Sequence, residues 1–141
     1  MVKKNISIFL IVWFVSIAAY ANNAFDDLCQ LINNNQLSSQ TYTLDHQFRA
    51  KSIQGHGYVR SVEKDGFGDV ILRLSTTRDR FAEGMISVTV YVKKTYITEA
   101  LKYRAGDYIY FSGTLGGASG IAREIIIHNS AISRFHEVIR R

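Results

Sequence analysis

Apolar residues recur at every second position over four stretches of the chain, residues 51–62, 70–74, 86–93 and 108–115. A fifth stretch, residues 123–133, carries three β-branched isoleucines in succession. A strand whose side chains point alternately to two faces produces a period of two, and β-branched residues suit a largely buried strand. The pattern therefore predicts five strands, each with one face in a common core.

Glycines occupy inward positions in two of these strands. Gly55 and Gly57 share a face with Ile53 and Val59 in the first strand, and Gly113 lies on the apolar face of the fourth. A glycine inside a strand indicates a sharp bend or a close approach of another segment. We expect Gly57 and Gly113 to mark such places.

Two short stretches show the helical period instead. The spacing of the apolar residues in residues 25–32 predicts a helix lying across one opening of the barrel, with a partner-binding helix as the alternative. Thr95 is the expected cap of a second, shorter helix. The apolar positions of the two helices are Phe25, Leu28, Cys29 and Ile32 in the first, and Ile97, Ala100 and Leu101 in the second.

The predicted order is helix, three strands, short helix, two strands. A helix between the third and fourth strands is the arrangement of the OB-fold, a five-stranded Greek-key barrel, so a mainly β fold of this kind is predicted. Residues 55–59 (GHGYV), 104–113 (RAGDYIYFSG) and 126–132 (IIHNSAI) resemble the small secreted bacterial OB-fold proteins called tRNA-anti-like. The resemblance covers about residues 51–132. It implies the fold, and it brings no established catalytic residues with it.

The N-terminus has the layout of a secretory signal peptide. Lys3 and Lys4 precede a short apolar run, and Ala19-Tyr20-Ala21 matches a small-x-small cleavage pattern. We expect removal of residues 1–21, no membrane span afterwards, and export to the periplasm or medium; an uncleaved anchor is the alternative. The remaining regions are residues 22–50 (helix and connector), 51–133 (barrel) and 134–141 (basic tail).

Charge and cysteine content narrow the picture only slightly. Seventeen basic residues face twelve acidic ones, and loss of Lys3 and Lys4 would leave a net charge of +3. Such mild basicity fits either nucleic-acid binding or an ordinary soluble surface. Cys29 is the only cysteine, so no disulfide can form within the chain. We expect it to be a small buried apolar residue, with pairing to another molecule as the alternative.

No catalytic or metal-binding set stands out in the sequence. The four histidines, His46, His56, His128 and His136, lack the close spacing of a metal site. His56 and His128 are the one pair that adjacent strands could bring together. We therefore predict no enzymatic activity, no cofactor and no metal.

The outer faces of the first three strands carry the candidate binding residues. Aromatic and basic side chains on adjacent strands form the kind of surface on which OB-folds hold oligonucleotides and oligosaccharides, although any barrel also needs a polar exterior. Two segments could form a rim, residues 75–85, with Arg78, Asp79, Arg80 and Phe81, and the glycine-rich residues 116–120. The candidate residues are His56, Tyr58, Arg60, Arg73, Tyr91 and Lys93.

These features predict an exported, non-enzymatic OB-fold binding module. One alternative is a protein-interaction or inhibitor module of the cell envelope, and another is a single-stranded nucleic-acid binder acting outside the cytoplasm. The expected partner is accordingly an envelope protein, an oligosaccharide or a single-stranded nucleic acid.

Overall fold

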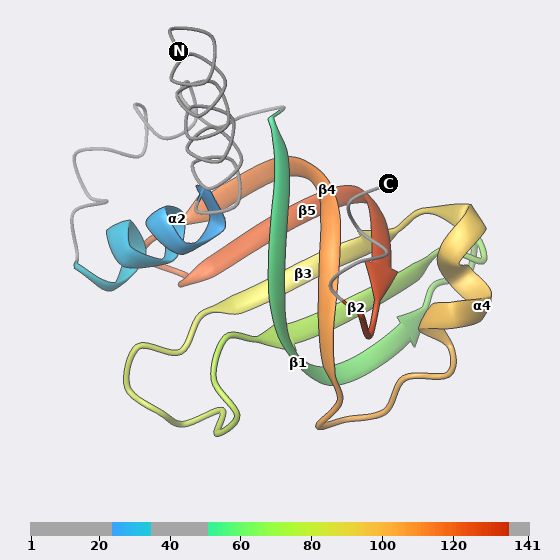
Figure 1. Ribbon diagram of the computed structural model, residues 1–141, viewed down its shortest axis with the longest axis horizontal. Helices are drawn as coiled ribbons and strands as arrows, with labels where there is room; N and C mark the ends of the chain where they lie inside the picture. Colours follow the sequence, from blue (N-terminus) through green and yellow to red (C-terminus); the bar gives the residue numbers. More distant parts are fainter. Residues whose placement is uncertain (1–23, 35–50, 136–141) are drawn as a thin grey trace, which may run out of the picture.

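The computed structural model describes residues 24–34 and 51–135. Five strands close into a barrel in the order β1-β2-β3-β5-β4 (Figure 1). Neighbouring strands are antiparallel except β3 and β5, which are parallel. The elements are α2 (Ala24–Asn33), β1 (Ser52–Lys64), β2 (Val70–Ser75), β3 (Ser87–Val92), η1 (Lys94–Tyr96), α4 (Ile97–Ala100), β4 (Tyr108–Ser119) and β5 (Glu124–Ser133).

The core consists of the inward positions that the apolar alternation predicts. Ile53 and Val59 of β1, and Ile109 and Phe111 of β4, are buried, as are the corresponding aliphatic residues of β2, β3 and β5. The predicted mainly β barrel, with one helix before β1 and a short one between β3 and β4, is thereby confirmed. One outward residue departs from the prediction: Thr89 is 4% exposed. It lies opposite the long side chain of Arg73 and donates a hydrogen bond to Oε1 of Glu124 at 2.9 Å.

β1 bends around the barrel and changes its neighbour along its length. Residues 52–58 pair with β4, and residues 58–64 pair with β2, with a register shift between Val59 and Ser61. Glycine is required on the inner face near this bend. A Cβ at Gly55 would lie 2.8 Å from the ring of Phe25, and one at Gly57 would lie 3.0 Å from the carbonyl oxygen of Ser75. The expected close approach at Gly57 is confirmed.

α2 closes one end of the barrel, as its apolar stripe predicts. Figure 1 shows the helix at that end, and Phe25, Leu28 and Ile32 are buried in the same core as the strands, while Cys29 is half-buried. The ring of Phe25 meets that of Phe111 edge to face, with centroids 5.4 Å apart. Asp26 and Asp27 in the first turn suit the positive end of the helix dipole.

The short helix between β3 and β4 differs in detail from its prediction. Thr95 is not a cap: Lys93 precedes η1, and no side chain bonds to the free N–H groups there. Leu101 is half exposed, and Tyr103 is buried in its place. The apolar stripe is too short to fix which of two neighbouring apolar residues turns inward, because only four residues are α-helical.

The glycine-rich residues 116–120 do not form the expected loop. β4 continues to Ser119, where Gly117 and Ala118 pair with Ile126 and Ile125 of β5. The turn is confined to residues 120–123, with Arg123 at a positive φ of 51°. The ring of His128 lies over Gly116, so glycine here permits a close crossing inside the sheet.

Several predictions fall outside the described residues. They concern the signal peptide (residues 1–21), the connector (residues 35–50) and the tail from residue 136 onward. Within residues 24–34 and 51–135, no helix is long and apolar enough to cross a membrane.

Candidate nucleic-acid interface

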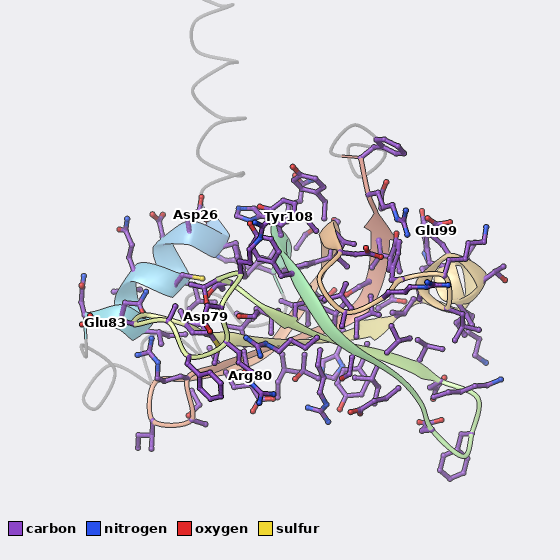
Figure 2. The ribbon with its side chains drawn as sticks, turned by 90° about the horizontal axis from the view of Figure 1, so that it is seen from below. Asp26, Asp79, Arg80, Glu83, Glu99 and Tyr108 are labelled. Carbon is purple, nitrogen blue, oxygen red and sulfur yellow. The ribbon has the colours of Figure 1, made fainter. Side chains whose placement is uncertain are left out.

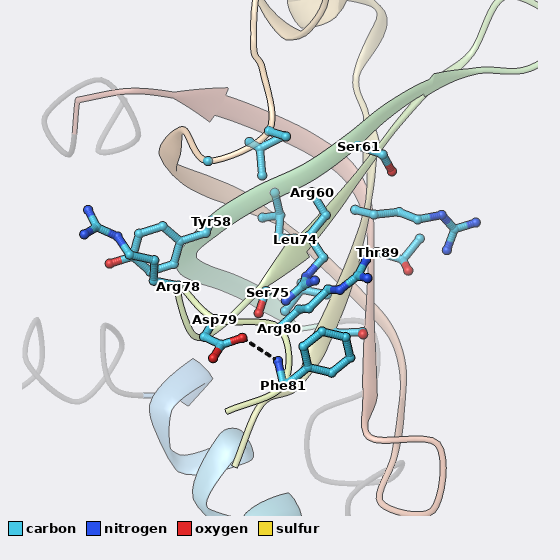
Figure 3. Close-up of a pocket in the computed structure, with 16 residues that line it drawn as sticks. Tyr58, Arg60, Ser61, Leu74, Ser75, Arg78, Asp79, Arg80, Phe81 and Thr89 are labelled. Carbon is cyan, nitrogen blue, oxygen red and sulfur yellow. Dashed lines mark hydrogen bonds between the residues drawn. The ribbon is translucent and has the colours of Figure 1, made fainter. Parts of the chain in front are cut away.

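An open groove of about 1010 Å³ runs along the outer faces of β1, β2 and β3 and under the loop of residues 76–86 (Figure 3). Four arginines and a single acid, Asp79, are the charged residues that line it. Tyr58 and Phe81 add two aromatic rings. The arginines are Arg60 and Arg73 from the strands, and Arg78 and Arg80 from the loop.

The loop that carries Arg78 and Arg80 is held by bonds between side chains and backbone. Oγ1 of Thr76 accepts a hydrogen bond from the N–H of Ile86 at 3.0 Å, across the base of the loop. Oδ1 of Asp79 accepts one from the N–H of Phe81 at 2.9 Å (Figure 3). Asx turns of this type fix the backbone locally. Arg78 and Arg80 therefore extend from a loop whose backbone is fixed by hydrogen bonds.

Arg60 provides the most buried cation of the groove. It lies at the register shift between Val59 and Ser61, and its Nε is buried without a hydrogen-bond partner among the described residues. Burial, and then repulsion from Arg80, lowers the pKa of Arg60, while Asp79 opposes the shift. A guanidinium stays charged at neutral pH despite such a shift. A buried donor of this kind is usually satisfied by water or a ligand.

The loop arginines lie beside flat rings. The guanidinium carbon of Arg80 is 4.7 Å from the ring centroid of Phe81, and that of Arg78 is 5.8 Å from the ring centroid of Tyr58. Phe81 is 81% exposed, although it is one of the large apolar residues of the chain. Exposed rings beside cations offer stacking surfaces to a planar, negatively charged ligand.

Arg73 forms an ion pair with Glu63. Its Nε donates a hydrogen bond to Oε1 of Glu63 at 3.0 Å, and this bond raises the pKa of Arg73. Both side chains are about half exposed. Among the described residues, Arg60, Arg78 and Arg80 form no ion pair.

The six residues predicted from the sequence fall into three places. Tyr58, Arg60 and Arg73 line the groove together. Tyr91 lies further along β3 and stacks on His128 of β5, with centroids 4.9 Å apart. Lys93 follows β3, where its N–H bonds to Ser130, and is outside the groove lining.

His56 belongs to a third place, on the side of β1 that faces β4. It lies opposite Tyr110, whereas His128 lies opposite Thr114 further along β4. His56 and His128, the one pair of histidines that adjacent strands could have brought together, are therefore apart, because β4 separates β1 from β5. Among the described residues, no three side chains of His, Cys, Asp or Glu come together to hold a metal ion.

Two parts of this surface were not among the candidate residues predicted from the sequence. Arg78, Arg80 and Phe81 were expected only as a rim, yet they form one wall of the groove. The available signal was two arginines and a phenylalanine within the longest polar gap of the chain. Tyr108 and Tyr110 alternate outward on β4, but their proximity to β1 depends on a pairing that the sequence does not display.

The closed barrel with a helix between β3 and β4 defines an OB-fold protein. No protein-family model matches the chain, and no curated protein matches it either. Solved structures with similar folds include a small single-stranded DNA-binding protein from Streptomyces coelicolor, with 19% identity over 64% of this chain and 98% of that one, at a TM-score of 0.44.

Two further solved structures are similar to this chain at comparably low sequence identity. The single-stranded DNA-binding protein of Plasmodium falciparum, solved with single-stranded DNA, has 21% identity over 57% of this chain and 90% of that one, at a TM-score of 0.35. Aspartyl tRNA synthetase from Entamoeba histolytica has 16% identity over 67% of this chain but 20% of that one, at a TM-score of 0.45. Likeness at these identities concerns the fold alone.

Proposed function

We propose that this protein is a non-enzymatic OB-fold module that binds single-stranded nucleic acid in the groove of β1, β2, β3 and the loop of residues 76–86. One observation carries the proposal. Three guanidinium groups without an acidic partner among the described residues converge on a groove that also exposes the ring of Phe81. Cations recognise the phosphates, and the rings of Tyr58 and Phe81 stack against the bases.

The charge of the groove favours this ligand over the other two expected partners. A neutral oligosaccharide has no group that requires unpaired guanidinium groups. A protein partner is typically bound through an apolar centre with a polar rim. Here the arginines lie inside the groove, and Arg60 is the most enclosed of them. An anionic chain with planar rings matches both features of the lining.

Salt dependence of binding tests the electrostatic part of the proposal. For single strands, the slope of log affinity against log salt is about −0.7 for each neutralised phosphate. We expect oligothymidylate to bind the protein with a steep slope. Replacing Arg78 and Arg80 by alanine should flatten that slope by about 0.7 for each arginine.

The control for this double variant is Lys102→Ala. Lys102 is also an exposed cation, but it lies beside α4 and outside the groove lining. Its removal should leave the salt slope unchanged. Equal slopes for the wild type and the double arginine variant would overturn the proposed groove.

Stacking is tested with a second ligand of similar charge. Phe81→Ala should weaken oligothymidylate binding, because stacking contributes about 1–3 kcal/mol per base. It should leave binding of a sulfated glycan unchanged, since that ligand offers charge without aromatic rings. If both ligands weaken equally, or if neither binds, the nucleic-acid assignment fails.

We also propose that the protein is exported and acts outside the cytoplasm, as the resemblance to the tRNA-anti-like proteins implies. The basic start, the short apolar run and Ala19-Tyr20-Ala21 support removal of residues 1–21. Intact-mass measurement of protein recovered from the periplasm or medium tests this. Recovery of the uncut chain from the membrane pellet would contradict it.

A further inference from the structure

A second group of rings adjoins the groove on the side of β1 that pairs with β4. We name it the tyrosine ledge, and it consists of His56, Tyr58, Tyr108 and Tyr110. The ring of Tyr58 is 4.8 Å from that of Tyr108, which is 5.4 Å from that of Tyr110. Tyr58 also lines the groove, so the ledge and the groove share a residue. In Figure 2, Tyr108 lies near Asp26, away from Arg80.

The ledge is built by strand pairing and is held in place from below. His56 lies opposite Tyr110, and Tyr58 lies opposite Tyr108, which sets all four side chains on one outer face. The Tyr108 hydroxyl and Nδ1 of His56 are hydrogen-bonded at 2.6 Å. The ring of Phe25 supports His56 at a centroid distance of 5.7 Å. Rings held in this way lose little freedom when a ligand stacks on them.

The ledge remains open to solvent although its members contact one another. Tyr108 is 38% exposed and the side chain of His56 is 42% exposed. Burial, with smaller contributions from Tyr110, Tyr58 and Asp26, raises the pKa of Tyr108, so its hydroxyl stays neutral. Tyr108 therefore presents a neutral ring on the ledge at physiological pH.

We propose that the tyrosine ledge is a second subsite for the same single-stranded nucleic acid. Bases that follow the segment bound in the groove stack on the rings of the ledge. This inference rests on the proposed function of the groove. Because Tyr58 belongs to both surfaces, aromatic rings continue from β1 and the loop of residues 76–86 onto β4. The single-stranded nucleic acid can follow these rings. The two surfaces differ chemically, because the groove contacts phosphates as well as bases, whereas the ledge contacts bases alone.

The charges around the ledge fit this division. On the side of β4, the carboxylate of Asp26 lies beside the ledge, with its Oδ1 3.7 Å from Nε2 of His56, while the guanidinium of Arg78 lies beside Tyr58 on the side of the groove. A carboxylate disfavours phosphate at this place, whereas a stacked base carries no charge. Occupancy of the ledge should therefore add affinity without steepening the salt dependence.

The experiment measures the affinity of the purified protein for labelled oligothymidylates of about 4 to about 16 nucleotides, the range that one OB-fold covers. The wild type should bind the longest oligonucleotide more tightly than the shortest by about tenfold for each base stacked on the ledge. The Tyr108→Ala, Tyr110→Ala double variant should lose that gain and keep the wild-type affinity for the shortest. The matched Tyr108→Phe, Tyr110→Phe variant should retain the gain, because it keeps both rings.

If the alanine variant keeps the wild-type gain with length, the ledge proposal is overturned. If affinity does not rise with length in the wild type, the ledge proposal is overturned and the groove proposal stands. If the alanine variant weakens short and long oligonucleotides equally, the tyrosines act through the fold, and the ledge proposal is again overturned. If no oligonucleotide of any length binds, both proposals are overturned together.

Discussion

The two halves of β1 differ on both faces, and the change comes at Tyr58, where the strand passes from β4 to β2. Next to β4, the inner face has glycine under the rings of Phe25 and Phe111, and the outer face is aromatic. Next to β2, the inner face is aliphatic and the outer face carries Arg60 and the pair of Arg73 with Glu63.

This difference predicts that the inner face of the first half contributes mainly to stability and that the outer face of the second half contributes mainly to binding. In the first half, ring packing on the inner face leaves no spare volume, so that substitutions there should act on the free energy of unfolding. In the second half, the charged side chains lie on the outer face and the aliphatic core lies on the inner face. Substitutions of the outer side chains should therefore change ligand affinity with little effect on stability. The predictions below test that division, beginning with the largest expected effect.

Phe25→Ala should cause the largest loss of stability. The ring is 2% exposed, and it closes the barrel end against Phe111. Truncation of a buried phenylalanine costs about 3–5 kcal/mol, because a cavity remains. Phe67→Ala is the matched control: its ring is 95% exposed, and its loss should change stability by less than about 0.5 kcal/mol. Urea denaturation measures both, and equal midpoints would show that α2 is not part of the core.

Gly113→Val should destabilise the protein by about 1–3 kcal/mol or more through overpacking. A Cβ at this position would lie 2.6 Å from the carbonyl oxygen of His128, and backbone cannot move aside as a side chain can. Gly117→Val, in the same strand, is the control, because nothing lies within 4 Å of its Cβ position. Thermal unfolding distinguishes the two variants. Similar melting temperatures would mean that the inward assignment of β4 has no energetic consequence.

Most of the fold can be predicted from the local pattern of apolar residues, whereas the candidate site depends on which strands pair with one another. Alternation in residues 86–92 and helical spacing in residues 25–32 are consequences of burying one face, so each is visible in the sequence. The extent of β4 was underestimated because glycine marks both turns and close crossings. The ring of His128 over Gly116 and the pairing of Gly117 with Ile126 distinguish these two cases, and both are contacts with β5.

The candidate site shows the same limit. Alternation gives the outward direction of Tyr58, Arg60 and Arg73, and all three line the groove. It does not say that Tyr91 turns toward His128, because the parallel pairing of β3 with β5 is non-local. Nor does it give the shape of the loop of residues 76–86, which depends on hydrogen bonds such as that from the N–H of Phe81 to Asp79.

Cys29→Ala should cost on the order of 1 kcal/mol, less than the loss of either large contact above. Burial, with a smaller contribution from Asp26, raises the pKa of the Cys29 thiol to about 12 from 9.0. The thiol of the folded protein is therefore protonated at pH 8, and it should react slowly with iodoacetamide until urea unfolds the chain. Its contribution to stability is present below pH 9.0 and should decline between pH 9.0 and about 12, because the unfolded thiol ionises first. Rapid alkylation of the folded protein would contradict this account.

Glu63→Gln should have the smallest effect on stability and yet change binding. Glu63 and Arg73 form an exposed pair, and such pairs contribute about 0.2–1 kcal/mol. Loss of the carboxylate frees the fourth groove arginine for phosphate, so oligothymidylate should bind more tightly and with a salt slope steeper by about 0.7. Glu99→Gln is the matched control, because it removes the same charge from α4, outside the groove lining. If both variants raise affinity equally, the effect comes from net charge alone. If neither does, Arg73 does not contact the ligand, and the charged half of β1 acts through Arg60 and the loop.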